Sequence, residues 1–296
     1  MKKFISFADS RLREPLQRIH EQAKAMHFFD CVKTLDESYF DESFKSEYKD
    51  KLSFKVKGFG YWCWKAYIML RELEDMPEGS QLYYCDAGCH LNPRGIARLR
   101  EYSTMLETCP LGIIAFSIEH IEKQYTKGDV FAFLNVLERK DITDTHQVQA
   151  GIVFIRKCKA SVNFIKEWMN CWQTDFSLID DSPSRIPNFP DFITPRHDQS
   201  VFSCLCKLRG ALLLSSRELE PPPGSARDIE AWKKLKESPI LAMRDRYGKS
   251  DAKKLRKYKF ISSLPLGPIS RAYQKKLDKA YETKISLMNP PPYMLD

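Results

Sequence analysis

Tyr83-Tyr84-Cys85-Asp86-Ala87-Gly88 is the stretch of this sequence that decides the fold. An apolar run of strand length, Leu82 to Cys85, ends directly in the carboxylate of Asp86. Buried strands that end in a polar group are typical of open α/β sheets, which collect ligands at the carboxyl ends of their strands. The stretch therefore predicts an α/β sheet with Asp86 at its ligand-binding edge.

Other strands and helices alternate along the chain, which supports the α/β class. Strands are expected at residues 4–7, 28–35, 112–117 and 151–155, and helices at residues 12–26, 65–73 and 161–172. Residues 130–133 fit a short strand, although the run from Phe131 to Leu137 fits a helix equally well. Residues 180–195 contain four prolines and should form a long loop.

The length and composition fit one large α/β domain or two small ones. Of the 296 residues, 43% are hydrophobic, which is enough to bury a large core. Pro221-Pro222-Pro223-Gly224 should end this core, so the α/β domain is placed at residues 1–225 and a partly helical extension at residues 226–296. Residues 244–281 hold 12 Lys/Arg and 3 Asp, whereas the whole chain carries a net charge of +8. The positive charge is therefore concentrated in the extension.

Neither a membrane span nor a secretion signal is expected. No apolar run approaches the roughly 18 residues of a transmembrane helix, and charged residues from Asp9 to Glu14 interrupt the apolar start. The nine cysteines are odd in number and mostly lie in apolar stretches, which favours buried thiols over disulfides. Cys85, Cys89 and His90 lack a second ligand pair at the spacing of a zinc site. We therefore expect a cytoplasmic protein.

Asp86-Ala87-Gly88 resembles the acidic motif with which nucleotide-sugar transferases hold a divalent cation against a diphosphate, so Asp86 is the expected ligand. Mg²⁺ and Mn²⁺ prefer oxygen ligands, and a cation beside a diphosphate stabilises the charge on the leaving phosphate. The usual second carboxylate is missing, because position 88 is Gly88. Either Asp86 is the single protein ligand, with water and phosphate oxygens completing the shell, or the reaction is independent of metal. A strand-end Asp before a glycine is also common in simple turns.

The segment from Lys57 to Lys65 places several aromatic rings between two lysines. Trp62 could stack on a sugar or base, and Lys65 could meet a diphosphate as a point charge. The alternative is a hydrophobic helix start with Trp62 and Trp64 in the core. The segment is not a dinucleotide-binding fingerprint, because Cys63 stands where the third glycine is needed.

Two further segments suit sugar recognition. Gln149-Ala150-Gly151 precedes the expected strand, where small residues let the backbone approach a sugar and an amide can bond its hydroxyls. Arg196-His197-Asp198-Gln199-Ser200 lies where the long loop meets a helix, and it combines a base with an amide. A tight strand entry and helix capping by Asp198 or Ser200 are the structural alternatives. A hydrolase triad is not favoured, because Ser200 lies in no Gly-x-Ser-x-Gly turn.

The order of these segments resembles a GT-A-fold glycosyltransferase of the surface-polysaccharide type, over residues 4–206. The resemblance rests on residues 7–10, 58–65, 84–88, 149–151 and 197–200. The later motifs are similar to the Asn-Ala-Gly and Asp-Gln pairs of the retaining family that includes glycogenin and the lipooligosaccharide galactosyltransferases, with Gln in place of Asn. The resemblance implies a Rossmann-like mixed sheet flanked by helices, and it makes residues 1–225 the catalytic domain.

The resemblance also implies roles for individual residues. Those assigned to the nucleotide and diphosphate of the donor are Ala8, Asp9, Ser10, Lys65, Asp86, Ala87 and Gly88, with Asp86 also on the metal. Those assigned to the donor or acceptor sugar are Trp62, Gln149, Ala150, Gly151 and His197. Asp198 and Gln199 would be catalytic, with Asp198 as general base in an inverting enzyme, or either residue stabilising an oxocarbenium-like centre in a retaining one. The Ala-Gly and Asp-Gln pairs favour retention.

The predicted activity is transfer of a hexose from a nucleotide diphosphate sugar, such as a UDP-sugar, to a saccharide or lipid-linked glycan. Two other functions stay open. A sugar nucleotidyltransferase would also use a Rossmann-like sheet, although residues 8–14 contain none of the glycines of a phosphate loop. A non-catalytic membrane or nucleic-acid adaptor would act through the basic extension.

The basic extension is predicted to lie on an anionic membrane surface, at the inner face of the membrane. Residues 253–260 mix cations with bulky apolar groups, and Ile269, Tyr273, Leu277 and Tyr281 recur every four residues. A solvated tail is the alternative. Nucleic-acid binding is not favoured, because none of its common motifs occurs.

Overall fold

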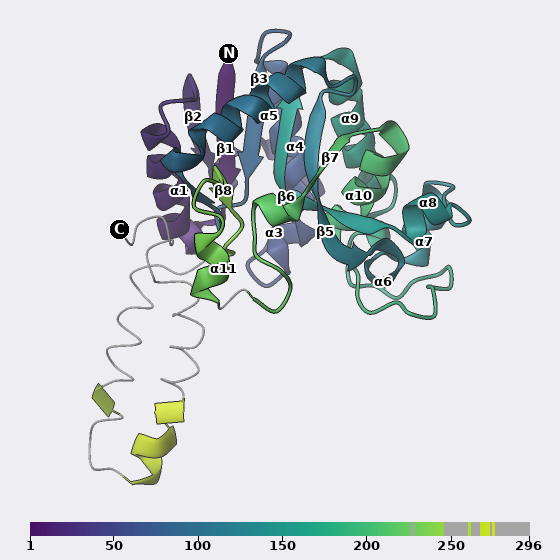
Figure 1. Cartoon of the computed structure of the whole chain (residues 1–296). Coiled ribbons are helices and arrows are strands. Elements are labelled where there is room, and N and C mark those ends of the chain that lie inside the picture. The colour runs from purple at the N-terminus through teal and green to yellow at the C-terminus, as the bar shows by residue number, and fades with distance from the viewer. Residues whose placement is uncertain (226–227, 246–259, 262–266, 273, 276–296) are drawn as a thin grey trace. The chain divides into compact units, whose positions relative to one another are not determined.

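The computed structural model describes residues 1–225, 228–245, 260–261, 267–272 and 274–275 (Figure 1). The chain divides into two compact units. The first contains residues 1–5, 29–85 and 100–216, and the second contains residues 6–28, 86–99 and 217–296. Each unit is assembled from separate parts of the sequence, so neither corresponds to a single continuous segment.

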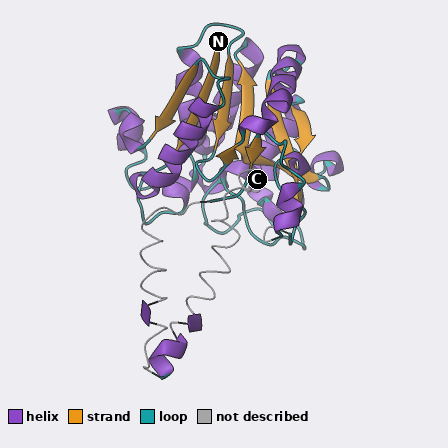
Figure 2. Cartoon of the chain, turned by 60° about the vertical axis from the view of Figure 1, so that its left-hand side comes forward, coloured by secondary structure: helices purple, strands orange, loops and turns teal. Residues whose placement is uncertain are grey.

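The first unit is built on a mixed sheet of six strands in the order β2-β1-β3-β6-β5-β7 (Figures 1 and 2). The strands are β1 (Lys2–Phe7), β2 (Cys31–Leu35), β3 (Gln81–Cys85), β5 (Ile113–Ile121), β6 (His146–Arg156) and β7 (Leu212–Ser215). β3 is parallel to β1 and antiparallel to β6, and β5 is antiparallel to β6 and parallel to β7. The predicted α/β class with a mixed sheet is confirmed.

The helices of the first unit are α2 (Glu42–Glu47), α3 (Gly58–Tyr61), α4 (Trp64–Glu74), α6 (Glu122–Tyr125), α7 (Gly128–Phe133), α8 (Lys140–Thr143), α9 (Lys159–Thr174), α10 (Asp198–Arg209), residues 100–108 of α5 (Ile96–Thr108), and the 3₁₀ turns η2 (Glu37–Tyr39) and η4 (Phe176–Leu178). Helices α4, α6 and α10 pack against the sheet, and other helices pack on them. α10 packs on β6, and α9 packs on both α4 and α10. The rings of Trp168 and Phe202 meet at 4.7 Å between α9 and α10. Tyr102 of α5 packs edge-on against Phe116 of β5.

The structure decides between the two alternatives for residues 130–133, and it corrects the expected position of Gln149-Ala150-Gly151. Residues 130–133 belong to helix α7 and not to a strand, because Val130 and Phe131 are both buried in a helical turn. Four apolar residues cannot distinguish a buried strand from a buried helix by their spacing. Gln149-Ala150-Gly151 lies inside β6 and does not precede it. Gln147 and Gln149 are both buried there, so the polar residues did not mark the start of the strand.

The second unit includes residues from beyond the predicted boundary at 225. Its elements are η1 (Ser10–Leu12), α1 (Arg13–Ala25), β4 (His90–Leu91), η3 (Pro93–Gly95), α11 (Ile229–Lys233), β8 (Ile240–Leu241) and part of η5 (Ser216–Glu218). β4 and β8 pair antiparallel. Trp232, Leu241 and Met243 form a buried cluster. Packing therefore continues to residue 245, whereas the catalytic and membrane roles assigned to the two sides of residue 225 stay predictions.

Leu241→Ala is expected to lower the free energy of unfolding by about 2–5 kcal/mol, because it leaves a cavity at a fully buried site. Ile193→Ala, at a side chain that is 60% exposed, should change it by less than about 0.5 kcal/mol. Urea denaturation of both variants tests this. An unchanged stability for Leu241→Ala would show that residues 240–243 do not belong to the cooperative core.

Among the residues that the structure describes, none of the helices combines the length and apolar character that crossing a bilayer requires. All nine cysteines are free, and only Cys31 and Cys158 are not fully buried. Most of the predicted membrane-binding segment, including Tyr273, Leu277 and Tyr281, lies outside the described residues. Ile269 is described and is 54% exposed.

Candidate functional site

A left-handed turn at residues 58–62 is the most unusual backbone feature of the first unit. Gly58, Phe59, Gly60, Tyr61 and Trp62 have φ angles of +60°, +54°, +99°, +52° and +61°. A residue with a Cβ pays about 1–2 kcal/mol in this region of φ, and three of these five have one. Strain of this kind persists only where surrounding contacts hold it, and it is common at functional sites.

The turn presents two aromatic rings to His197. The ring of Tyr61 lies 5.2 Å from the His197 ring, and that of Trp62 lies 5.5 Å from it. Trp64 is buried, and its Nε1 donates a hydrogen bond to Gly58 O at 3.0 Å. Trp62 is only partly buried. The structure therefore places Trp64 in the core and leaves Trp62 accessible for stacking on a ligand.

His197 is buried, and one of its ring nitrogens has no hydrogen-bond partner among the described residues. Its Nδ1 lies 2.7 Å from Ile179 O, and because a carbonyl only accepts hydrogen bonds, Nδ1 must carry the proton. Nε2 then holds a lone pair, and among the described residues it has no hydrogen-bond partner. Burial lowers the pKa of His197 below its usual value, and the charges of Lys57 and Lys127 act in the same direction. The ring is therefore neutral at pH 7.

The buried histidines make stability depend on pH. Burial lowers the pKa values of both His90 and His197. As the pH falls below the pKa of an unfolded histidine, the unfolded chain therefore binds protons more readily than the folded chain does. The free energy of unfolding should thus be constant above pH of about 6.5 and fall below it, by at most about 1.4 kcal/mol per pH unit for each histidine. Urea titrations between about pH 5.5 and 7.5 test this. A slope that His197→Gln leaves unchanged would exclude His197 as a contributor.

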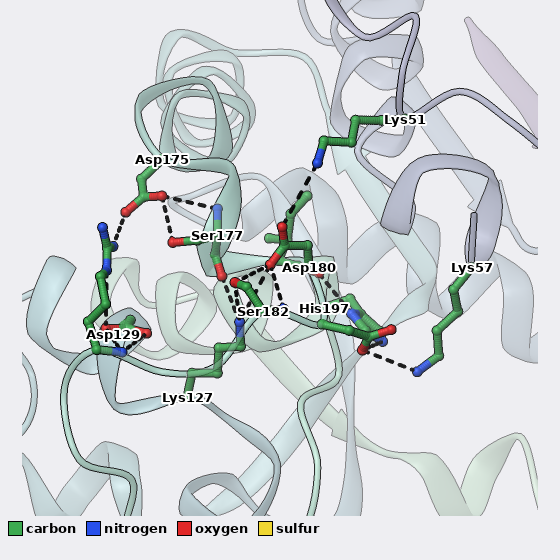
Figure 3. A network of polar contacts seen from close by, with 12 residues as sticks. Lys51, Lys57, Lys127, Asp129, Asp175, Ser177, Asp180, Ser182 and His197 are labelled. Carbon is green, nitrogen blue, oxygen red and sulfur yellow. Dashed lines mark hydrogen bonds and ion pairs between the residues drawn. The ribbon is translucent and has the colours of Figure 1, made fainter. Parts of the chain in front are cut away.

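Three lysines surround the loop that follows η4, as Figure 3 shows. Lys51 and Lys127 approach Asp180 to 4.0 and 3.7 Å, and Lys57 lies 3.7 Å from Asp181. Asp181 also lies 3.7 Å from His197 Nε2. The sequence analysis predicted only a loop at residues 180–195. The adjacent carboxylates of Asp180 and Asp181, at the start of this loop, were a signal that lysines could gather there.

Lys65 and Asp198 form a buried ion pair. Lys65 Nζ lies 3.4 Å from Asp198 Oδ2, and each side chain is 4% exposed. Asp198 begins α10, and its carbonyl oxygen accepts a hydrogen bond from Trp168 Nε1 at 3.1 Å. Lys65 also lies over the Tyr84 ring at 5.5 Å. The structure therefore brings together two predicted site residues, but it pairs Lys65 with a carboxylate of the protein.

Gln199 connects α10 to β6. Its Nε2 donates to Gln147 Oε1 at 2.7 Å, and its Oε1 faces the backbone N–H of Ala150 at 3.4 Å. Gln149 Nε2 is buried and has no hydrogen-bond partner among the described residues. Gly151 follows Ala150 in the same strand. The Gln-Ala-Gly and Asp-Gln segments thus meet at one place, as a shared sugar site requires.

The remaining predicted residues lie in the second unit. Ala8 and Ala87 belong to one buried cluster with Leu16. Asp9 caps η1, which begins at Ser10, and it accepts hydrogen bonds from Arg11 N and Nε at 3.1 and 2.8 Å. Burial acts to raise the pKa of Asp9, but the hydrogen bonds and charge of Arg11 outweigh it and lower that pKa. Two of the predicted donor segments are therefore in contact.

The turn from Asp86 to Cys89 is held by Asp245 and by Arg18 of α1. Asp245 N donates to Gly88 O at 2.8 Å, and Arg18 donates to Ala87 O at 3.0 Å. A Cβ on Gly88 would lie 3.1 Å from Cα of Arg244, which is closer than ordinary contact. A side chain at position 88 would thus press on the backbone at residues 244–245.

The side chains around Asp86 that the structure describes do not form a metal site with several protein ligands. No group of three or more His, Cys, Asp or Glu side chains gathers anywhere in the described ranges. His90 has both ring nitrogens engaged, with Asp245 at 2.9 Å and Gln22 at 3.1 Å. Burial raises the pKa of the Cys89 thiol far above its usual value, so it stays protonated. Asp86 remains as a single carboxylate that directly follows β3.

Comparison with known proteins gives matches in structure only. No family model and no curated protein matches the chain. It is similar to a glycosyltransferase involved in the glycosylation of the major capsid of PBCV-1, with 10% identity over 86% of this chain and 97% of that one and a TM-score of 0.48. It is also similar to the galactosyltransferase LgtC in complex with donor and acceptor sugar analogues, with 14% identity, coverage of 75% and 76%, and a TM-score of 0.41.

A third structure of the same class is mouse xyloside xylosyltransferase 1, with 12% identity, coverage of 82% and 97%, and a TM-score of 0.43. All three TM-scores are below 0.5 and all three identities are below 25%, so none of these similarities by itself assigns an activity. The chain is similar in structure to glycosyltransferases, the class that the order of its motifs predicted.

Proposed function

We propose that this protein is a glycosyltransferase that moves a hexose from a nucleotide diphosphate sugar, such as a UDP-sugar, to a saccharide or lipid-linked glycan. The observation that carries this proposal is the convergence of the Lys65–Asp198 ion pair, the Gln199 amide and strand β6 in the first unit. A buried carboxylate and an oriented amide suit a reaction in which positive charge develops on a sugar ring.

The Lys65–Asp198 pair supports a retaining mechanism. An ammonium 3.4 Å away favours the charged form of a carboxylate, which suits Asp198 to stabilising an oxocarbenium-like centre better than to accepting a proton. In this mechanism the bond between sugar C1 and the diphosphate oxygen breaks, and the oxygen keeps the electron pair. The acceptor oxygen then bonds to C1, and its proton passes to the leaving phosphate. Asp198 and Gln199 stay unchanged throughout.

The acceptor is proposed to lie against Trp62 and His197. An aromatic ring stacks on the apolar face of a sugar, and the His197 Nε2 lone pair can accept a hydrogen bond from a hydroxyl. In the donor site, Ala8, Asp9 and Ser10 are proposed to contact the nucleoside, and the turn that starts at Asp86 is proposed to contact the diphosphate. A membrane-bound acceptor would suit the basic residues 244–281.

The test is donor turnover across UDP-, GDP-, CMP- and dTDP-sugars, with and without Mn²⁺, for the wild type and for Asp86→Ala. Selective turnover of one donor, lost in Asp86→Ala, would support the proposal and identify the sugar. The assays without Mn²⁺ test whether turnover needs a divalent cation. Absence of binding and turnover with every donor would overturn the proposal and favour an adaptor.

A further inference from the structure

Glu122, the first residue of α6, is fully buried, and four side chains donate hydrogen bonds to its carboxylate. Oε1 accepts from Thr126 Oγ1 at 2.6 Å and from Gln147 Nε2 at 2.9 Å. Oε2 accepts from Lys207 Nζ at 2.7 Å and from Ser203 Oγ. With a lysine as its counter-charge, Glu122 is a carboxylate that accepts hydrogen bonds and donates none.

This carboxylate determines which way two glutamine amides point. Because Glu122 only accepts, Gln147 must turn its NH₂ group toward it, and its carbonyl oxygen then faces Gln199. That oxygen also only accepts, so Gln199 must present its NH₂ group to Gln147 at 2.7 Å. The Gln199 carbonyl oxygen is left on the opposite side, where it accepts a hydrogen bond from the backbone N–H of Ala150 at 3.4 Å. The orientation of each amide follows from donor and acceptor chemistry alone.

We propose that Glu122 and Gln147 are positioning residues that hold the Gln199 carbonyl oxygen, and not its NH₂ group, toward the reacting sugar. The proposal rests on the proposed function. An amide oxygen carries partial negative charge and stabilises an oxocarbenium-like centre, whereas an amide NH₂ group would destabilise it. Lys207 and Ser203, both on α10, fix the other oxygen of Glu122. The relay is the series of hydrogen bonds from Glu122 through Gln147 to Gln199.

Gln147→Met tests the relay, and Thr126→Val is its matched control. Both positions are fully buried. Each variant removes one hydrogen bond to the same oxygen of Glu122, and each also removes the hydrogen bond of 3.3 Å from Gln147 Nε2 to Thr126 Oγ1. Only Gln147→Met also removes the acceptor of Gln199 Nε2. We expect kcat for sugar transfer to fall about 10- to 100-fold in Gln147→Met, with KM for the donor unchanged, and to stay near the wild-type value in Thr126→Val.

A double-mutant cycle with Gln199→Ala separates positioning from general loss of stability. Gln199→Ala should lower kcat little further in the Gln147→Met background, and by its full factor in the Thr126→Val background. Equal loss of kcat in Gln147→Met and Thr126→Val, or fully additive effects of Gln147→Met and Gln199→Ala, would overturn the proposal.

A readout that needs no activity tests the relay itself. The side-chain NH₂ protons of Gln199, assigned by comparison with Gln199→Ala, should exchange slowly with solvent in the wild type and in Thr126→Val, and fast in Gln147→Met. Fast exchange in the wild type would overturn the relay. If the relay is intact but no donor is turned over, the proposed function is wrong, and the positioning role is wrong with it.

Discussion

Asp198→Asn is expected to lower the rate of sugar transfer by about 10²–10³-fold. The substitution keeps the shape of the side chain but removes the negative charge that we assign to stabilising the transition state. It also leaves the buried Lys65 ammonium without its carboxylate counter-charge, which should lower the free energy of unfolding by about 3–5 kcal/mol. Single-turnover kinetics at a temperature where the variant remains folded separate the two effects.

Glu167→Gln is the matched control for Asp198→Asn. Glu167 pairs with Arg209, which lies on the same helix as Asp198, at 2.6 Å, and the two side chains are 33% and 50% exposed. A pair this exposed contributes at most about 1 kcal/mol, and the variant should transfer sugar at the wild-type rate. If Asp198→Asn also kept a rate near that of the wild type while folded, Asp198 would have no catalytic role.

Gly58→Ala is expected to lower the free energy of unfolding by about 2–4 kcal/mol and to weaken acceptor binding. A Cβ at this position would lie 2.3 Å from the Trp62 ring, and the backbone has a φ of +60°. The ring would have to leave its place beside His197, so the stacking surface proposed for the acceptor would be lost. Chemical denaturation and titration with candidate acceptor saccharides measure the two effects.

Gly79→Ala isolates the cost of the backbone conformation. Gly79 has a φ of +77°, and a Cβ there would meet no atom within 4 Å. This variant should lose only about 1–2 kcal/mol and should bind acceptors as the wild type does. Similar results for Gly58→Ala and Gly79→Ala would mean that the Trp62 ring does not depend on the space at Gly58.

The sequence predicted best where a local pattern coincides with burial. Leu82 to Cys85 lies in a strand that Asp86 directly follows. Helix α1 lies within residues 12–26, and residues 161–172 lie within helix α9. It failed where the pattern was short or polar. The apolar residues at 130–133 fit both the period of a strand and that of a helix, and they form helix α7. Gln149 lies inside a strand although it is polar, and it is buried there.

The candidate site was found in part. The sequence singled out Lys65, Asp198 and Gln199 by type and order, but no pattern indicated that Lys65 pairs with Asp198. Glu122 and Gln147 carried no signal at all, since an isolated carboxylate and an amide in a polar stretch are most often solvated. Their importance comes from burial and from partners 4 to 85 positions away in the chain.

The sequence by itself determined the α/β class, the order of the motif segments and the strand that delivers Asp86, because these depend on local periodicity and on residue type. Tertiary structure decided which charges meet, which nitrogen of His197 carries the proton, and which backbone lies against Gly88. Those features depend on contacts between distant segments and on the exclusion of water from them, and neither can be read from the order of residues along the chain.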